Sequence, residues 1–346
     1  MLFRSCGAAL GTSATTSGPG GTTFSSSLIA AGAGDLAYEP HSGLIYLAVS
    51  APGVANTNCV AALDPQAGSL AMGVFAGSQP STLAVSDDGS LLYVGLSGGE
   101  TVERFQLPPL THDLTIPLVF GPLYNSQPVA GDVQVAPGVP GTIAVVARST
   151  QIDPSSLGVA IFDNSTPRST VFGTNQAADA NTLAWGASAG GLYGLNVENG
   201  NADFYTLAVG AAGATLVSDV KALLTQTGGR IHFAGGLIYA DNGQVLDPTT
   251  NTLAGTFNLA TVGPPPASVV AVDTTLSVAF FATSDRTSGI LNLLAFDATH
   301  FTPQRQISIP SLAALPTRIV RWGADGLAVL LNNGTVLLVK GTFVTG

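Results

Sequence analysis

The feature that most constrains this chain is a block of strand-like sequence that recurs seven times along almost its whole length. Each block begins with a short apolar strand, crosses a turn and enters a second strand rich in Leu, Ile, Val and Tyr. Most intervals between block starts are 47 to 50 residues, and one is 38. A fixed period of this size with only strand signals is typical of a β-propeller, in which each repeat forms one four-stranded sheet. The blocks begin at Asp35, Thr82, Asp132, Thr182, Arg230, Ser268 and Arg318.

The last block is one strand short. Residues 318–322, 326–331 and 335–339 supply three strand-like runs before the sequence ends, and a spare run at 22–29 precedes the first block. We therefore expect an all-β, seven-bladed propeller with four-stranded antiparallel blades. The N-terminal strand is expected to complete the last blade, which would close the ring and remove its open sheet edges.

The second block contains the most specific motif. Residues 77–94 read GSQPSTLAVSDDGSLLYV, which joins a Gly-x-x-Pro lead-in, an inner strand, an Asp-Gly turn and a Tyr-Val strand. Asp88 and Gly89 favour a hairpin turn because Gly accepts positive φ. The motif resembles the YVTN-type repeat of bacterial surface propellers. This resemblance implies a seven-bladed, lactonase-like architecture and a location at the cell surface.

The composition excludes two classes of partner. Charged residues make up 9% of the chain, against about 25% in ordinary soluble domains. The net charge of −10 argues against nucleic-acid binding, which needs clustered Lys and Arg. No stretch approaches the roughly 18 apolar residues of a membrane-spanning helix, so no membrane insertion is expected. A surface with so little charge favours an exported protein, extracellular or at the cell surface, or one buried against copies of itself.

The domain organisation follows from the repeat. Residues 21–346 are expected to form one propeller domain, and residues 1–20, with their Ser, Thr, Gly and Pro, have the composition of a linker. Cys6 and Cys59 are the only cysteines; they are either unrelated small residues or one disulfide that pins the N-terminal segment to the first blade. Asn164 and Asn333 lie in Asn-x-Ser/Thr sequons and are candidate glycosylation sites in an exported protein.

Four of the seven block starts are charged. Asp35, Asp132, Arg230 and Arg318 share one repeat position, so a closed ring should place them at the same height around one mouth of the central channel. His232 is the one histidine expected to face this channel. The group is interpreted in two ways: it binds a small ion or polar ligand, or its opposite charges satisfy one another.

The sequence contains few candidates for catalytic or metal-binding residues. A lactonase-like Ca²⁺ site would need several carboxylate or amide oxygens around the ion, and the equivalent positions in other blocks are Thr or Ser. We therefore expect no metal ligands and no cofactor, with Ca²⁺ kept as an alternative. No Gly-x-Ser-x-Gly occurs, and no catalytic residue is predicted. Arg321 and Trp322 form either a surface site or, beside the Asp-Gly turn that follows, a hairpin whose Trp packs between blades.

These observations favour a non-enzymatic binding or scaffolding module whose partner is another protein or a surface polymer. The expected contact elements are the loops at 50–58, 108–113 and 147–157, because loops on a rigid scaffold commonly carry binding. Two alternatives remain. One is a self-assembling subunit of an extracellular filament or layer, and the other is a lactonase-like metal-dependent hydrolase.

Overall fold

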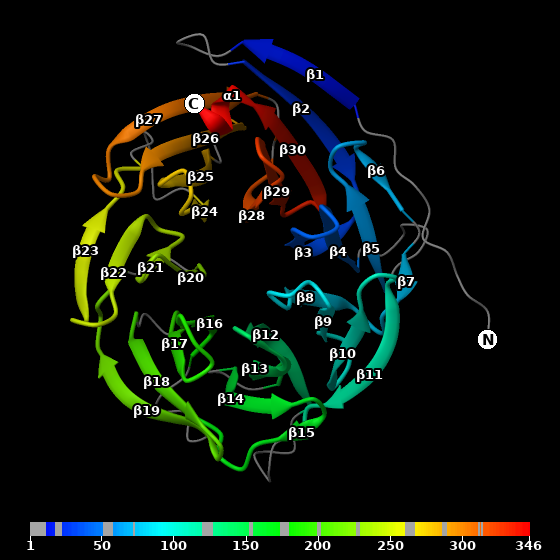
Figure 1. The fold of residues 1–346 in the computed structure, drawn as a ribbon, viewed down its shortest axis with the longest axis vertical. Coiled ribbons are helices and arrows are strands. Elements are labelled where there is room, and N and C mark those ends of the chain that lie inside the picture. The colour runs from blue at the N-terminus through cyan, green and yellow to red at the C-terminus, as the bar shows by residue number, and fades with distance from the viewer. Residues whose placement is uncertain are drawn as a thin grey trace.

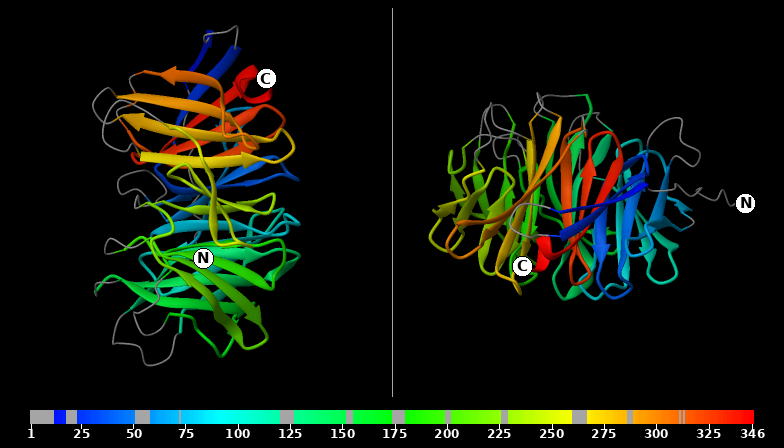
Figure 2. Two further views of the ribbon diagram at one scale, coloured as in Figure 1. Left: turned by 90° about the vertical axis from the view of Figure 1, so that its left-hand side faces the viewer. Right: turned by 90° about the horizontal axis from the view of Figure 1, so that it is seen from above.

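The chain folds into a closed ring of seven antiparallel sheets around a central axis, and this confirms the expected seven-bladed propeller (Figure 1). Seen from the side, the strands run through the thickness of the ring and their connections gather at its two faces (Figure 2). The computed structural model describes residues 12–17, 23–50, 58–71, 73–119, 127–151, 155–173, 180–198, 202–225, 229–259, 267–285, 289–310, 312 and 314–346.

Blades 1 to 4 each run outward from the channel in chain order. Blade 1 contains β3 (Ala33–Glu39), β4 (Leu44–Val49), β5 (Cys59–Asp64) and β6 (Ser69–Leu70), and β7 (Val74–Phe75) also pairs with β5. Blade 2 contains β8 (Pro80–Val85), β9 (Leu91–Leu96), β10 (Thr101–Gln106) and β11 (Thr111–Pro117). Blade 3 contains β12 (Pro128–Ala136), β13 (Val139–Ser149), β14 (Ser156–Asp163) and β15 (Thr166–Pro167). Blade 4 contains β16 (Thr182–Trp185), β17 (Gly191–Leu195), β18 (Phe204–Gly210) and β19 (Gly213–Val220).

The remaining blades complete the circle. Blade 5 contains β20 (Ile231–Ala234), β21 (Leu237–Ala240), β22 (Gln244–Asp247) and β23 (Thr252–Thr256). Blade 6 contains β24 (Ala267–Asp273), β25 (Val278–Asp285), β26 (Ile290–Asp297) and β27 (Pro303–Ile309). Blade 7 contains β28 (Pro316–Trp322), β29 (Gly326–Leu331), β30 (Thr335–Gly341), β2 (Thr23–Ala30) and β1 (Thr12–Ser17). The one short helix among the described residues is α1 (Thr342–Thr345), and no described helix has the length and apolar character needed to span a bilayer.

The two ends of the chain meet in blade 7. β2 pairs antiparallel with β30 along its whole length and buries Phe24 and Ile29, so the expected N-terminal closure is confirmed. Figure 1 shows the blue β2 beside the red β30. β1 then pairs with β2 as a fifth strand. β1 lies inside segment 1–20, which was expected to be a linker, and here that expectation is wrong because its backbone continues the sheet.

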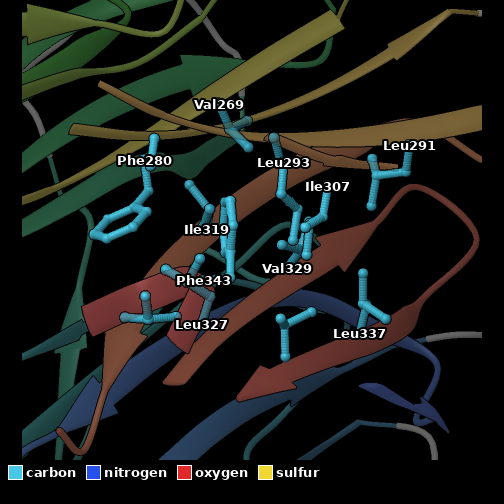
Figure 3. Packing of buried hydrophobic residues seen from close by; sticks show 14 of the residues in the cluster. Val269, Phe280, Leu291, Leu293, Ile307, Ile319, Leu327, Val329, Leu337 and Phe343 are labelled. Atoms are coloured by element: carbon cyan, nitrogen blue, oxygen red, sulfur yellow. The ribbon is translucent and has the colours of Figure 1, made fainter. Parts of the chain in front are cut away.

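Apolar side chains fill the space between neighbouring blades. Successive residues of a strand point to opposite faces of the sheet, so each middle strand contributes to two layers. In β29, Leu327, Val329 and Leu331 pack toward blade 6, whereas Ala328 and Leu330 pack toward blade 1. Figure 3 shows the layer between blades 6 and 7. This two-sided burial explains why the strands read as continuous apolar runs.

The outer strands of four blades share a β-bulge. One residue is extra relative to the neighbouring strand in each case, and a bulge of this kind bends the strand and interrupts its pairing edge. Because an outer strand would otherwise present a straight row of free backbone groups, the bulges limit edge-to-edge pairing with other molecules. The extra residues are Asp113 in β11, Val217 in β19, Ala254 in β23 and Gln304 in β27.

Five turns at the face opposite the starts of the inner strands follow one pattern. An acidic residue is followed, four positions later, by a residue with φ between +53° and +73°. The carboxylate accepts hydrogen bonds from backbone N–H groups inside the turn; Asp297, for example, accepts from Thr299 and His300 at 2.8 and 2.9 Å. The acid therefore satisfies turn amides that no strand can pair. The turns begin at Glu39, Asp64, Asp247, Asp273 and Asp297.

These turns predict acid sensitivity. Backbone hydrogen bonds from His300 and side-chain bonds from Thr249 lower the pKa of Asp297 and Asp247, respectively. Burial raises the pKa of Glu39, but hydrogen bonds from Ser42 and His41 outweigh it and lower the pKa below 4.5. A lowered folded-state pKa adds stability that is lost as the pH falls through it. The free energy of unfolding, measured by urea titration, should therefore fall most steeply below about pH 4.5.

Glu39→Gln should make the fall in the free energy of unfolding below about pH 4.5 less steep, because the amide cannot titrate. Glu100→Gln, at an exposed position of blade 2, serves as the matched control and should leave this pH dependence unchanged. If the free energy of unfolding of Glu39→Gln falls with pH as steeply as that of the wild type, Glu39 does not contribute to the acid sensitivity.

The closure predicts that the N-terminal strands stabilise the whole ring. Deletion of residues 1–30 removes the buried Phe24 and Ile29, and should lower the free energy of unfolding by at least about 3 kcal/mol. Ile29→Ala should cost about 2–4 kcal/mol through the cavity that it leaves, whereas Ser25→Ala, at an exposed position of the same strand, should cost little. Unchanged thermal melting after the deletion would show that the closure is not needed.

Candidate functional site

The charged residues at the repeat positions lie together at one mouth of the central channel. Asp35, Asp132 and Arg318 lie within β3, β12 and β28, and Arg230 immediately precedes β20, which contains His232. The innermost strands of all blades surround the axis in Figure 1. Because these strands start at the same face of the ring, the five residues lie close together there.

A shared backbone irregularity sets the position of these residues. In β3, β8, β12 and β28 the pairing with the second strand shifts by one residue just before the repeat position. An extra residue of this kind turns the following side chain and increases the local twist. The same bulge in four blades places their side chains at one height. The residues that follow it are Asp35, Thr82, Asp132 and Arg318.

The two predicted carboxylates tie neighbouring blades together. Asp35 Oδ2 accepts a hydrogen bond from the backbone N–H of Leu83 at 3.0 Å, and Asp132 Oδ2 accepts one from Leu183 at 2.8 Å. Both carboxylates are buried. An innermost strand has a free edge toward the channel, so these N–H groups have no strand partner of their own. Blade 1 is thereby joined to blade 2, and blade 3 to blade 4.

Asp241 does the same for blades 5 and 6, and sequence reasoning missed it. Its Oδ1 accepts from the N–H of Val270 at 2.9 Å, and its Oδ2 from the N–H of Arg230 at 2.8 Å. His232 Nε2 lies 3.5 Å from Oδ1. Asp241 follows β21, directly opposite Arg230, in an Asp-Asn-Gly sequence that is typical of a turn. The sequence feature that points to Asp241 is Arg230, which occupies the repeat position of blade 5 where blades 1 and 3 have Asp.

Arg230 reaches across the channel between two blades. Its Nη2 lies 3.6 Å from Asp35 Oδ2 and its Nη1 lies 3.6 Å from Asp132 Oδ1. Arg318 Nε lies 3.5 Å from Asp35 Oδ1. Opposite charges therefore face one another, but these distances exceed the roughly 2.7–2.9 Å of a direct charge-assisted hydrogen bond. The group is electrostatically paired without being closely bonded.

The electrostatics of the two arginines differ. Burial disfavours the charged form of Arg230, but attraction to Asp35, Asp132 and Asp241 outweighs it and raises the pKa. Burial and repulsion from Arg230 lower the pKa of Arg318. Both stay protonated because the pKa of arginine is so high. The formal charges of three carboxylates and two guanidiniums thus sum to about −1, without His232.

The lactonase-like Ca²⁺ arrangement is not found in the part of the chain that the structure describes. There, no three His, Cys, Asp or Glu side chains lie close enough to hold a metal ion. Asp35, Asp132 and Asp241 each use at least one oxygen to accept a strand N–H, so their lone pairs are partly committed.

Arg321 and Trp322 precede the hairpin turn between β28 and β29, as the second interpretation expected. Trp322 is buried in the layer between blades 7 and 1. The Arg321 guanidinium lies 3.0 Å from Asp273 Oδ2 and donates to the carbonyl oxygens of Ala324, at 3.0 Å, and of Gly326. These bonds hold the turn between β28 and β29.

The other predicted residues lie away from the channel. Cys59 is buried in β5 and is disulfide-bonded, while its expected partner, Cys6, lies outside the described residues. Asn164 is exposed in the turn after β14, where its Oδ1 accepts from Arg104 Nη1 at 2.6 Å. Asn333 is exposed in the turn after β29, where its Oδ1 accepts from the N–H of Thr335 at 3.0 Å.

The strands that flank two of the three expected contact loops end at the channel mouth. Asp35 pairs with Ala48 and Asp132 with Val146, so the strands that lead into 50–58 and 147–157 end at the mouth. Of the expected loop at 108–113, residues 111–113 belong to β11, and the connection between β10 and β11 lies at the opposite face. Residues 51–57 and 152–154 lie outside the described residues.

Comparison with known proteins identifies the fold alone. No family model and no curated protein matches the sequence. Hydrazine synthase of Kuenenia stuttgartiensis is similar over 90% of this chain and 96% of its own, with a TM-score of 0.65 and 11% identity. The Cps50 (Swd1) β-propeller domain of Myceliophteria thermophila is similar over 89% and 96%, with a TM-score of 0.65 and 13% identity. The Dos1 propeller is similar over 94% and 80%, with a TM-score of 0.56 and 16% identity.

The carboxylate ties predict a graded loss of stability. Asp132→Ala should lower the free energy of unfolding by about 2–3 kcal/mol, because it leaves the N–H of Leu183 without an acceptor and removes a charge facing Arg230. Asp132→Asn keeps an acceptor oxygen and should cost less, about 1 kcal/mol. Asp325→Ala, in the hairpin after β28, is the control and should change little. If urea unfolding shows Asp132→Ala to be as stable as this control, the tie has no structural role.

Proposed function

We propose that this protein is an exported or cell-surface, non-enzymatic propeller that binds another protein or a surface polymer. The observation that carries the proposal is the use of the channel-mouth carboxylates. Asp35, Asp132 and Asp241 each accept a backbone N–H of the next blade, so they hold the ring rigid. A rigid ring that presents many loops on two faces suits recognition.

Two observations support export. Charged residues make up 9% of the chain, and Cys59 is disulfide-bonded. Disulfides persist in oxidising compartments such as the bacterial periplasm and cell surfaces, and they are rare in the cytosol. Both features agree with a protein that works outside the cytosol.

A kinship to YVTN-type surface propellers belongs to the same proposal. In the motif of blade 2, Gly77 has φ of +111° and a Cβ there would lie 2.5 Å from Leu96 Cδ1, so no other residue fits without a shift. Asp88 accepts hydrogen bonds from the Ser86 and Ser90 hydroxyls, and Gly89 has φ of +68°. Gly77, Asp88 and Gly89 of the motif thus each have a structural role, which supports the proposed relationship.

Self-assembly is a second candidate, favoured by one surface. Leu216 and Val217 in β19 and Leu253 in β23 are 48%, 64% and 46% exposed. Their strands are the outer strands of adjacent blades, joined by a hydrogen bond of 3.3 Å from Asn251 to Ser218. Apolar side chains on neighbouring outer strands offer a contact for a second copy in a filament or layer. No observation favours the lactonase-like hydrolase in the same way.

The test is a pull-down with the full chain from a cell-surface extract, after light scattering of the chain alone. We expect a monodisperse chain that retains an identified protein or polymer, and the purified partner should bind again. A particle size that grows with protein concentration would instead support self-assembly. Leu216→Asp should then abolish this growth, whereas Thr215→Asp, at the exposed neighbouring position, should not. Absence of any retained partner together with turnover of a substrate would refute the proposal.

A further inference from the structure

The guanidinium groups of Arg230 and Arg318 have unused hydrogen-bonding capacity. Neither group makes a direct hydrogen bond to any residue that the structure describes, and Arg230 Nη1 is buried without a partner. Each guanidinium carries several N–H donors in a planar fork. A buried donor without an acceptor is costly, so this mouth favours a ligand that supplies oxygen atoms.

Other arginines in this chain behave differently. Arg104, Arg148 and Arg168 each place a guanidinium nitrogen 2.6–2.9 Å from a carboxylate oxygen, which is the spacing of a direct ion pair. At the channel the corresponding distances for Arg230 and Arg318 are 3.5–3.6 Å. The chain thus forms close arginine pairs where they join strands, and leaves the channel pair open.

Two hydroxyl groups at the same repeat position are also without partners. Thr82 and Thr182 are 1% and 5% exposed, and the Oγ1 atom of each is buried with no hydrogen-bond partner among the described residues. They occupy blades 2 and 4, between the blades that supply Asp35, Asp132 and Arg230. The open guanidiniums therefore lie in a ring that contains further unpartnered donors.

We propose that Arg230 and Arg318 together bind one carboxylate group at the channel mouth, supplied by a small organic acid or by an acidic side chain of a partner protein. The planar carboxylate has two oxygens that match a guanidinium fork. The two side chains are accessible to it, because Arg230 is 26% and Arg318 15% exposed while the Asp35 side chain is 2% exposed. The partner-derived version rests on the binding function proposed above.

The charge of the site disfavours a dianion more strongly than a monoanion. Burial, and then repulsion from Arg230, lower the pKa of Arg318, and an anion between the two guanidiniums would relieve that repulsion. Asp35, Asp132 and Asp241 nevertheless leave the group with a formal charge of about −1. A phosphate carries about −1.5 to −2 at neutral pH and would be repelled more strongly than a carboxylate. Carboxylate is therefore the expected ligand chemistry.

The experiment compares ligands on the full chain by thermal shift and calorimetry. Sodium acetate should raise the melting temperature in a saturable way, whereas sodium chloride at equal ionic strength should not, and inorganic phosphate should bind more weakly. A Gly-Glu-Gly peptide with blocked termini is tested in the same way, as a model of an acidic side chain of a partner protein. Binding of acetate alone identifies a small acid as the ligand, and much tighter binding of the peptide identifies an acidic side chain.

Variants locate the site. Arg230→Met and Arg318→Met should each weaken binding at least about tenfold, which corresponds to one lost charge-assisted contact. Arg305→Met in β27 is the matched control, because Arg305 is also partly buried and forms no ion pair among the described residues; it should bind as the wild type does. Arg230→Lys keeps the positive charge but loses the planar guanidinium fork. It replaces Arg230→Met if that variant does not fold, and it should also bind the carboxylate more weakly than the wild type.

Three results would overturn the inference: no saturable effect of acetate or peptide, equal binding by the wild type and all arginine variants, or tighter binding of phosphate than of carboxylate. A partner from the pull-down that still binds Arg230→Met and Arg318→Met at full strength would leave the proposed function intact and remove this site from it.

Discussion

The free inner edge of each blade is the constraint on which the rest of the ring depends. Seven sheets packed face to face bury their apolar side chains, but the strand nearest the axis has no neighbouring strand to pair with the N–H groups that face the channel. Asp35, Asp132 and Asp241 solve this for every second junction by accepting an N–H of the next blade. Because these carboxylates are buried, they in turn require cations, and Arg230 and Arg318 supply them.

Closure is the second requirement, and it uses the opposite ends of the sequence. Without β2, the backbone edge of β30 would be unpaired, and the layer between blades 7 and 1 would lack Ile29. β1 extends this blade outward, so the last sheet is five strands wide where most others are four. The ring is thus held by backbone pairing at the seam and by carboxylate ties at the channel.

The sequence was sufficient for the ring and the seam, and it aligned Asp35, Asp132, Arg230 and Arg318 at one repeat position, because these follow from a repeat with a constant position. It was insufficient where a blade departs from the repeat. Asp241 follows a different strand and is part of a turn sequence, so periodicity does not align it with Asp35. β1 reads as linker because its Ser and Thr carry no apolar pattern; it is a strand only because β2 offers an edge. The spacing of the guanidiniums depends on side-chain geometry that no pattern encodes.

The short fifth blade links structure to recognition. Its repeat position holds Arg230, so the carboxylate that ties blade 5 to blade 6 has to come from Asp241, one strand further out. This exchange frees the repeat position to carry a cation into the channel. Asp35 and Asp132 cannot approach that cation closely, because each already holds a strand N–H in place. The same commitments that make the carboxylates structural therefore leave Arg230 with donors to offer, which is the condition for a ligand to bind there.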